Sequence, residues 1–351
     1  MADQRNGGIA WCDSSWNPTI GCSRASEGCF GCYAESLAFR FKGPGQHYEG
    51  LVRLVNGHPT WTGVVREVPS KLADPLRWRR PRKIFLDSTS DIFHAALPDA
   101  AIDKIFAVMA LSPAHIFQLL TKRSGRMKSY LSDPATPYRL AKVVETADFI
   151  HPYRSQSERQ RVAEVLTQDA GWPLANVAVG VSVESQPYVL ERLADLMATP
   201  AALRWASAEP LLSAIDIRAF LPGACDNESC GRCGRLDSQP GHGERCLGPK
   251  LDWLVIGGES GLDPRIFDAT WGRLLIAQCA EAGTPCFFKQ CGSAFYDADN
   301  AVAGARFKFP AGADARRFRR LIDRGGKNKA EWPEDLQVQQ FPGLFAATLA
   351  A

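Results

Sequence analysis

With 351 residues, of which 45% are hydrophobic and 23% charged, the chain has the composition of a globular protein and can bury the core of one barrel-sized α/β domain plus an insertion. Its net charge of +3 is too small to require a polyanionic partner, and no run of about 18 apolar residues predicts a transmembrane helix. Residues 1–10 lack the basic and then apolar pattern of a signal peptide. Eleven cysteines without such a signal predict a reducing compartment, so we expect a cytoplasmic protein whose grouped cysteines bind metals.

Apolar runs that alternate with helical patterns predict an α/β protein with a parallel sheet. Strands are expected at 19–21, 83–87, 115–120, 177–183, 203–207, 251–256 and 285–288. Helices are expected at 34–42, 72–79, 98–111 and 271–282, and after 183 with one face formed by Val189, Leu193, Leu196 and Met197. Six or seven βα units predict a partial or closed TIM-type (β/α) barrel of parallel strands. An open doubly wound sheet is the alternative.

Composition changes along the chain predict two insertions and an extension. We expect a (β/α) barrel over 1–304, interrupted by a polar helical insertion at 132–173 and by a Cys-rich insertion at 221–248. A basic C-terminal extension follows at 305–351. Residues 43–63 are rich in glycine and are expected to be irregular.

A loop near the start of the chain, WNPTIGCSRASEGCFGCYAE, carries three cysteines with the spacing C-x6-C-x2-C: Cys22, Cys29 and Cys32. A two-residue gap allows neighbouring sulfurs to converge on one ion or cluster. Structural zinc sites and simple electron-transfer clusters normally take four protein ligands, whereas three leave one coordination position for water, substrate or cofactor. The loop therefore predicts a reactive metal centre.

The string WNP-x2-GC-x6-C-x2-CYAE, followed by Phe39-Arg40-Phe41, resembles the phage-associated three-cysteine-motif family (phage Gp37/Gp68-like, DUF5131). This family is a branch similar to radical S-adenosylmethionine (radical SAM) enzymes, in which three cysteines hold a [4Fe–4S] cluster and the unique iron chelates the amino and carboxylate groups of S-adenosylmethionine. The resemblance implies that Cys22, Cys29 and Cys32 hold such a cluster. The spacing departs from the commonest C-x3-C-x2-C, and Gly31 stands where an aromatic residue usually precedes the last cysteine.

In a (β/α) barrel the active site lies at the C-terminal ends of the strands. Polar residues follow the predicted strands here, in strings (SDIF-H, LTKR, GVSVE, EPLL, GGESG and FFKQ) that also occur in the family. The candidate catalytic residues are Asp91, Lys122, Arg123, Glu209 and Lys289. The resemblance implies that S-adenosylmethionine lies across this mouth, and the candidate cofactor-binding residues are Tyr33, Ser90, Asp91, Glu184, Glu209, Gly257, Gly258 and Glu259.

These residue types suit different parts of the cofactor. Ser90, Asp91, Glu184 or Glu209 could accept hydrogen bonds from the amino group or the ribose hydroxyls. Lys122 or Arg123 could pair with the methionine carboxylate or with a substrate phosphate. The backbone of the adjacent glycines after the sixth strand would permit a close approach to the cofactor.

A second cysteine group has the spacing C-x4-C-x2-C-x12-C and comprises Cys225, Cys230, Cys233 and Cys246, with His242 as a substitute ligand. Its polar surroundings cannot form a core, so metal binding would supply the folding free energy. We expect structural zinc, with an auxiliary [4Fe–4S] cluster as the alternative. A further cluster at Cys279, Cys286 and Cys291 is conceivable, but these residues read better as small buried hydrophobic side chains.

Two basic segments, 77–83 and 306–329, suit a phosphate backbone, and Trp78 could stack on a base. A solvated helix face is the alternative reading. The leading functional hypothesis is a radical SAM enzyme that generates a 5′-deoxyadenosyl radical and acts on nucleic acid or a nucleotide-derived substrate, in modification or repair. The alternatives are a non-enzymatic nucleic-acid-binding protein that carries zinc or an iron–sulfur cluster, and a zinc hydrolase or transferase. A nucleic acid and a three-Cys-motif partner protein are the expected partners, with no membrane.

Overall fold

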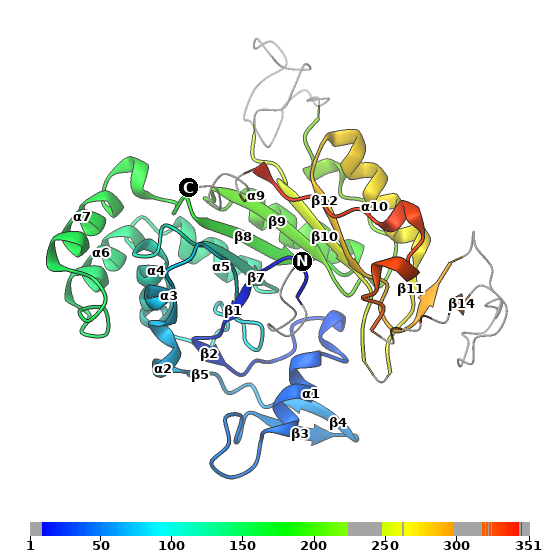
Figure 1. Ribbon diagram of the computed structural model, residues 1–351, viewed down its shortest axis with the longest axis horizontal. Helices are drawn as coiled ribbons and strands as arrows, with labels where there is room; N and C mark the ends of the chain where they lie inside the picture. Colours follow the sequence, from blue (N-terminus) through cyan, green and yellow to red (C-terminus); the bar gives the residue numbers. More distant parts are fainter. Residues whose placement is uncertain are drawn as a thin grey trace. The chain divides into compact units, whose positions relative to one another are not determined.

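The computed structural model describes residues 9–223, 248–261, 263–297, 318–319, 321, 323, 325–343 and 345 (Figure 1). The chain divides into two compact units. The first comprises 1–181, 199–203 and 343–351, and the second comprises 182–198 and 204–342. No helix within the described ranges is long and apolar enough to cross a membrane.

The first unit is built on four parallel strands in the order β1 (Ser14–Trp16), β6 (Lys83–Leu86), β7 (Ile116–Thr121) and β8 (Val177–Ser182). All six residues of β8 are buried, as expected for a parallel strand covered on both faces. The crossovers are helical: α2 (Pro69–Leu72), α3 (Asp74–Arg77), α4 (Asp99–Ala110), α5 (Ser124–Ser132), α6 (Thr136–Thr146), α7 (Gln156–Leu166) and η3 (Asp169–Gly171). Three of these, α6, α7 and η3, lie within the predicted helical insertion at 132–173.

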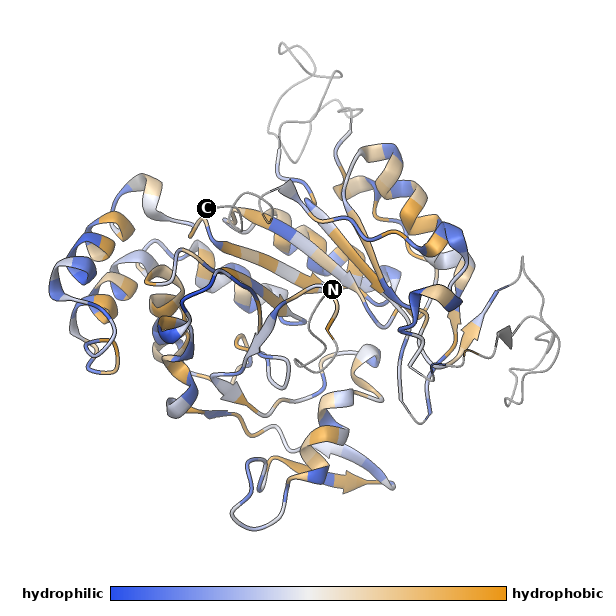
Figure 2. Cartoon of the chain, viewed as in Figure 1, coloured by the Kyte–Doolittle hydropathy of each residue, from blue (hydrophilic) through white to orange (hydrophobic). Residues whose placement is uncertain are grey.

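The second unit contains three parallel strands in the order β9 (Leu203–Ala208), β10 (Trp253–Gly257) and β12 (Cys286–Gln290). Helix α10 (Ala269–Ala282) connects β10 to β12; the side chain of Asp268 caps its first turn by accepting from Thr270 N, and Gly283 ends it in the left-handed region at φ 67°. Figure 2 shows hydrophobic residues along these strands. The remaining elements are α8 (Gln186–Tyr188), the π-helix η4 (Val189–Leu193), α9 (Ala194–Met197), η5 (Arg218–Phe220), β11 (Phe267–Asp268), β13 (Phe295–Tyr296), β14 (Phe318–Arg319), η7 (Lys329–Glu331) and η8 (Glu334–Leu336).

The strand order confirms an α/β fold with seven parallel strands. Within each unit the strands follow one another in chain order, without the reversal that defines a doubly wound sheet. β1 and β12 are the terminal strands of this order, so closure of a barrel stays a prediction. The predicted helix face after β8 is also confirmed, since Val189, Leu193, Leu196 and Met197 are all buried.

The prediction that residues 19–21 form the first strand of the parallel sheet is wrong. Residues 19–21 do not join the parallel strands; β2 (Thr19–Ile20) instead pairs antiparallel with β5 (Arg66–Glu67), and β1 takes the edge position. Pro18 separates β1 from β2 and cannot donate to a ladder. The backbone N–H of Thr19 points to the Asp87 carboxylate, at 3.4 Å, rather than to a neighbouring strand.

The predicted irregular segment 43–63 contains a β-hairpin, β3 (Val52–Val55) and β4 (His58–Trp61). Its turn residues Asn56 and Gly57 have φ values of 51° and 80°, as a two-residue type I′ turn requires. The hairpin packs on α1 (Tyr33–Arg40) around a small core of its own, formed by Ile20, Ala34, Ala38, Tyr48, Leu51, Val52 and Trp61. This small core carries the cysteine loop.

Candidate functional site

The three cysteines of the first group lie on consecutive turns of one loop in the first unit. Cys22 follows β2, Cys29 ends the short 3₁₀ helix η2 (Glu27–Cys29), and Cys32 precedes the first residue of α1. All three are partly exposed free thiols. Gly21, before the first of them, has a φ of 93°, and a Cβ there would lie 2.2 Å from the carbonyl oxygen of Val64, so the loop enters the site through a position that only glycine fits.

The thiols lie within electrostatic reach of one another. Burial raises the pKa of the Cys22 thiol to about 12, with smaller contributions in the same direction from Asp91, Cys32 and Cys29 and an opposing one from Arg123. Burial also raises the pKa of Cys32, and the charge of Cys29 adds to that rise. Thiols whose pKa is raised in this way, as those of Cys22 and Cys32 are, need a compensating cation before they become thiolates.

The donor chemistry of this loop fits an iron–sulfur cluster, since three thiols on one loop are the soft ligands that such a cluster takes. The arrangement is not a closed ligand shell: in the part of the chain that the structure describes, no group of three or more His, Cys, Asp and Glu side chains is positioned to hold a metal ion. Ligand identity therefore supports the prediction, and convergence of the sulfurs on one cluster stays a prediction.

A buried ion pair fixes the cysteine loop to α1. Arg24 donates from Nε and Nη2 to the two oxygens of Glu35, at 3.1 and 2.8 Å, and Glu35 is only 2% exposed. Glu35 also accepts from the backbone N–H of Trp61 at 3.0 Å, and Arg24 reaches Thr60 Oγ1 at 3.2 Å. The loop, the helix and the hairpin are thus held by one charged contact.

Arg123, which follows β7, connects the first cysteine to a carboxylate. Its Nη1 donates to Asp91 Oδ2 at 2.9 Å and lies 3.8 Å from Cys22 Sγ. Its Nη2 donates to the carbonyl and hydroxyl oxygens of Ser23 at 2.9 and 3.0 Å. The structure therefore brings together three of the predicted site residues, Cys22, Asp91 and Arg123.

The carboxylate of Asp91 is already saturated with donors. Besides Arg123 it accepts from Thr121 Oγ1 at 2.8 and 2.9 Å, from Phe93 N at 3.0 Å and from Lys122 N at 3.2 Å. This arrangement suits a residue that positions Arg123 better than one that removes a proton from a substrate.

His94 is a neighbour of the site that sequence reasoning did not select. Its Nδ1 accepts from the backbone N–H of Ala96 at 3.1 Å, so in the neutral ring Nε2 carries the proton and donates to Ser23 Oγ at 2.8 Å. Burial, followed by the charge of Arg123, lowers the pKa of His94 and favours this neutral form. The Ser23 oxygen consequently accepts from both His94 and Arg123, and its own hydrogen can point to a third group.

Two other predicted residues of the first unit lie beside this cluster. Ser90 Oγ donates to the carbonyl of Gly21 at 2.9 Å and accepts from Thr19 Oγ1 at 2.9 Å. Tyr33 is exposed, and its hydroxyl donates to the carbonyl of Ser88 at 2.6 Å. The Thr19 hydroxyl also contacts Asp87, a buried residue with a φ of 56° whose pKa burial raises to about 8.

The remaining predicted residues form separate contacts in the second unit. Lys289 Nζ donates to both oxygens of Glu209 at 2.7 and 2.9 Å, and Gln290 Nε2 donates to Glu209 at 3.0 Å and to the Gly258 carbonyl at 2.9 Å. This group joins the ends of β9, β10 and β12 in one polar cluster.

Glu259 and Glu184 are each paired with an arginine of the same unit. Arg265 donates to Glu259 at 2.7 and 2.8 Å, and Arg192 donates to the fully buried Glu184 at 3.0 Å. Both carboxylates therefore have a structural partner.

The two glycines after β10 are explained by packing. A Cβ on Gly258 would lie 2.3 Å from the Cys291 carbonyl oxygen, and one on Gly257 would lie 3.3 Å from the Glu209 side chain. Cys279, Cys286 and Cys291 are all buried, in agreement with the reading as small apolar side chains. The second cysteine group, Cys225, Cys230, Cys233 and Cys246 with His242, lies outside the described residues.

The basic segment 77–83 is largely engaged with its own unit. Arg82 stacks over Trp78 at 4.8 Å and donates to Ser14 Oγ, and Arg77 donates to the hydroxyl of Tyr153. One face of the Trp78 ring is therefore covered, which leaves less of it for stacking on a base. Most of the other basic segment, 306–329, falls outside the described residues.

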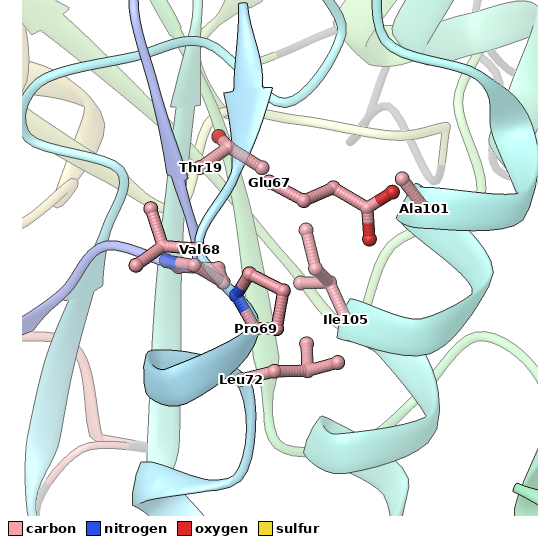
Figure 3. Close-up of a pocket in the computed structure, with 8 residues that line it drawn as sticks. Thr19, Glu67, Val68, Pro69, Leu72, Ala101 and Ile105 are labelled. Atoms are coloured by element: carbon pink, nitrogen blue, oxygen red, sulfur yellow. The ribbon is translucent and has the colours of Figure 1, made fainter. Parts of the chain in front are cut away.

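A small pocket of the first unit lies between β2, β5 and the helices α2 and α4. Figure 3 shows Val68, Pro69, Leu72 and Ile105 turned toward a common space, with Thr19 and Glu67 beside them. Its empty volume is about 180 Å³, below the roughly 300 Å³ at which pockets for small molecules begin. It is too small for a nucleoside cofactor.

Sequence reasoning missed Ser23, His94, Thr121, Arg24 and Glu35. Two signals pointed toward them: His94 lies in the SDIF-H string, in the loop after β6, and Thr121 lies in LTKR at the end of β7. The pairing of Arg24 with Glu35 crosses from a loop to a helix and has no local pattern in the sequence.

Comparison with known proteins gives one result. The model of a family described as "Protein of unknown function (DUF5131)" matches residues 6–331. No curated protein and no solved structure matches the chain. The match covers most of the chain and assigns no activity to it.

Proposed function

The chain belongs to the DUF5131 family, and from this membership and the cysteine site we propose that it is an iron–sulfur enzyme of the radical SAM type. Cys22, Cys29 and Cys32 would hold a [4Fe–4S] cluster. The substrate would be a nucleic acid or a nucleotide-derived molecule, and the family's phage association and a three-Cys-motif partner protein belong to the same proposal. Seven free thiols among the described residues agree with a reducing compartment such as the cytoplasm.

The observation that supports the proposal is that a cation and a hydroxyl lie beside the first of three thiols on one loop. Arg123 contacts Cys22 Sγ and Ser23, and the charges of Cys32 and Cys29 add to the rise in the pKa of Cys22. Bound to these thiols, the cluster would supply one electron for the reductive cleavage of S-adenosylmethionine.

The protein's own contribution would be to orient the cofactor and to fix the loop. Asp91 holds Arg123, and Arg123 holds the backbone and side chain of Ser23. The Ser23 hydroxyl, with His94 and Arg123 as donors to its oxygen, would donate its hydrogen to the cofactor carboxylate. The ion pair of Arg24 with Glu35 would keep the spacing between the cysteines.

The test is an anaerobic preparation of the full chain, reconstituted with iron and sulfide and then reduced with dithionite in the presence of S-adenosylmethionine. We expect about four iron atoms at the first cysteine group and release of 5′-deoxyadenosine. Cys29→Ala should abolish that release and lower the iron content. Cys279→Ala removes a buried thiol in the second unit and is the matched control; it should keep both.

Two results would contradict the proposal. One is a colourless protein that holds zinc alone after reconstitution, which would favour a zinc-bearing nucleic-acid-binding protein. The other is a coloured protein in which Cys29→Ala changes neither iron content nor 5′-deoxyadenosine. Variants at the second cysteine group, such as Cys230→Ala, should lower stability first if that group is structural.

A further inference from the structure

The β3–β4 hairpin presents apolar side chains where a soluble surface usually has polar ones. Leu54 and Val55 at its end are 54% and 39% exposed, and Phe41 and Val64 on the adjoining segments are 49% and 48% exposed. Figure 2 shows hydrophobic residues on α1 and on the hairpin. Leu54 and Val55 are neighbours beside the turn, and adjoining exposed apolar residues mark an interaction surface more often than scattered ones do.

The same region carries more positive than negative side chains. Residues 36–66 contain four basic side chains, Arg40, Lys42, Arg53 and Arg66, against a single acidic one, Glu49. Among the described residues neither Arg40 nor Arg53 has a side chain or a backbone oxygen as a partner. This part of the surface therefore combines apolar side chains with two arginines, Arg40 and Arg53, that have no partner among the described residues.

The register of the hairpin gives it two different faces. Val52 lies opposite Trp61, and both are buried against α1. On the other face Arg53 lies opposite Thr60, and Val55 lies opposite His58. The outer face is exposed beside the turn. Further from the turn, Thr60 Oγ1 accepts a hydrogen bond from Arg24 of the cysteine loop.

From these contacts we propose that the β3–β4 hairpin is the DNA-docking element of the protein, with its outer face and tip in a groove of a B-form duplex. A two-stranded β-ribbon fits the major groove of B-DNA, whereas the major groove of an RNA duplex is too narrow for side chains to read. Arg40, Lys42 and Arg53 face the phosphates, and the apolar tip contacts base edges. The proposal rests on the nucleic-acid substrate of the proposed function.

The hairpin is joined directly to the thiol loop. Besides the Arg24 contact, Gly63 N donates to the carbonyl of Cys22 at 3.2 Å. The turn lies about three residues beyond Thr60, or roughly 10 Å at strand spacing. Gly63 lies three residues further from the turn, so the first cysteine is roughly 20 Å from the tip. DNA that extends from the tip along the hairpin can therefore bring a base that leaves the stack near the cysteine loop.

The test measures binding of a fluorescein-labelled DNA duplex by anisotropy over a series of NaCl concentrations, without S-adenosylmethionine or reductant. Arg53→Ser should reduce the slope of log K against log salt by about 0.9, the value of one lost phosphate contact. Leu54→Ser with Val55→Ser should weaken binding at least tenfold and leave the slope unchanged. Thermal melting by circular dichroism verifies that these exposed substitutions leave the fold intact.

Arg161→Gln is the control, because Arg161 is an exposed arginine of helix α7 in the same unit and lies outside both basic segments. It should leave both affinity and slope unchanged. The inference is overturned if Arg161→Gln lowers the slope and Arg53→Ser does not, if an RNA duplex of the same sequence binds as tightly, or if the chain binds phosphatidylserine vesicles and no DNA. Since the assay involves no radical chemistry, its failure is separate from failure to form 5′-deoxyadenosine.

Discussion

The guanidinium of Arg123 lies 3.8 Å from the sulfur of Cys22, and the same nitrogen donates to Asp91 at 2.9 Å. A partly buried thiol and a buried carboxylate thus share one cation. Removing the cation would leave the carboxylate with neutral donors only and would raise the pKa of the thiol further.

We expect Arg123→Met to lower the free energy of unfolding by about 2–4 kcal/mol, because a buried carboxylate loses its charge partner. Urea unfolding of the metal-free protein measures this. Asp91→Asn in the same chain should restore part of the loss, so the double-mutant cycle should show coupling above about 1 kcal/mol. Lys104→Met breaks a more exposed ion pair with Glu67 and should have little effect. Equal losses in both variants would contradict the role given to Arg123.

The Cys22 thiol should be slow to react in the metal-free protein. With a pKa of about 12, it is ionised to about one part in ten thousand at pH 8, roughly a thousandfold less than an ordinary thiol of pKa near 9. Alkylation by iodoacetamide, followed peptide by peptide with mass spectrometry, should show Cys22 reacting much more slowly than a free cysteine peptide and faster as pH rises. Reaction at the rate of the peptide at pH 8 would show that the thiol is not desolvated as described.

Asp87 should make the protein less stable as pH rises. Its pKa in the folded protein, about 8, lies above the ordinary value of 3.8 because of burial. The stabilisation is therefore fully present below about pH 4 and is lost as pH rises through about 8. Asp87→Asn keeps an acceptor for Thr19 N and tolerates the left-handed backbone, so its stability should lack this decline.

Thermal unfolding of both proteins between pH 4 and pH 9 is the measurement for Asp87. The two curves should coincide at the acid end, and Asp87→Asn should be more stable by a few kcal/mol at most at the alkaline end. A constant difference between the curves at every pH would mean that Asp87 does not titrate in this range.

The ion pair of Arg24 with Glu35 should be worth far more than an exposed pair. Arg24→Met leaves the buried Glu35 carboxylate with the Trp61 N–H as its remaining donor among the described residues, and we expect the free energy of unfolding to fall by about 2–3 kcal/mol. Arg218→Met breaks the exposed pair with Asp216 and should leave the urea midpoint unchanged. Iron content after reconstitution should fall in Arg24→Met as well, because the loop loses its anchor. Full iron loading at normal stability would contradict this account.

The main strands could be predicted from the sequence because they are buried on both faces and form continuous apolar runs. Residues 83–86, 116–121, 177–182, 203–208 and 253–257 form strands close to the predicted limits. The edge strand β1 escaped notice because it contributes only Ser14, Ser15 and Trp16. The hairpin was missed although Asn56-Gly57 is a strong turn signal, because the surrounding glycines suggested an irregular segment.

The site was predictable only in part. Strand ends pointed to Asp91 and Arg123, which the structure places at Cys22. The strand ends could not reveal that Thr121 and backbone groups already fill the acceptor positions of Asp91. They also could not reveal that Glu184 is buried against Arg192, because both contacts depend on packing in the folded protein. Ser23 and His94 acquire their relationship only when a loop and a strand end meet.

Gly21 places a limit on how the region can be lengthened or shortened. Its missing side chain leaves room for the Val64 carbonyl, and the next peptide is tied to Gly63. Extra residues at the Asn56-Gly57 turn would extend the ribbon without shifting the first sulfur. One residue inserted between Thr62 and Val64 would displace the Cys22 sulfur itself. Natural or engineered changes in the length of the hairpin are therefore expected at the Asn56-Gly57 turn.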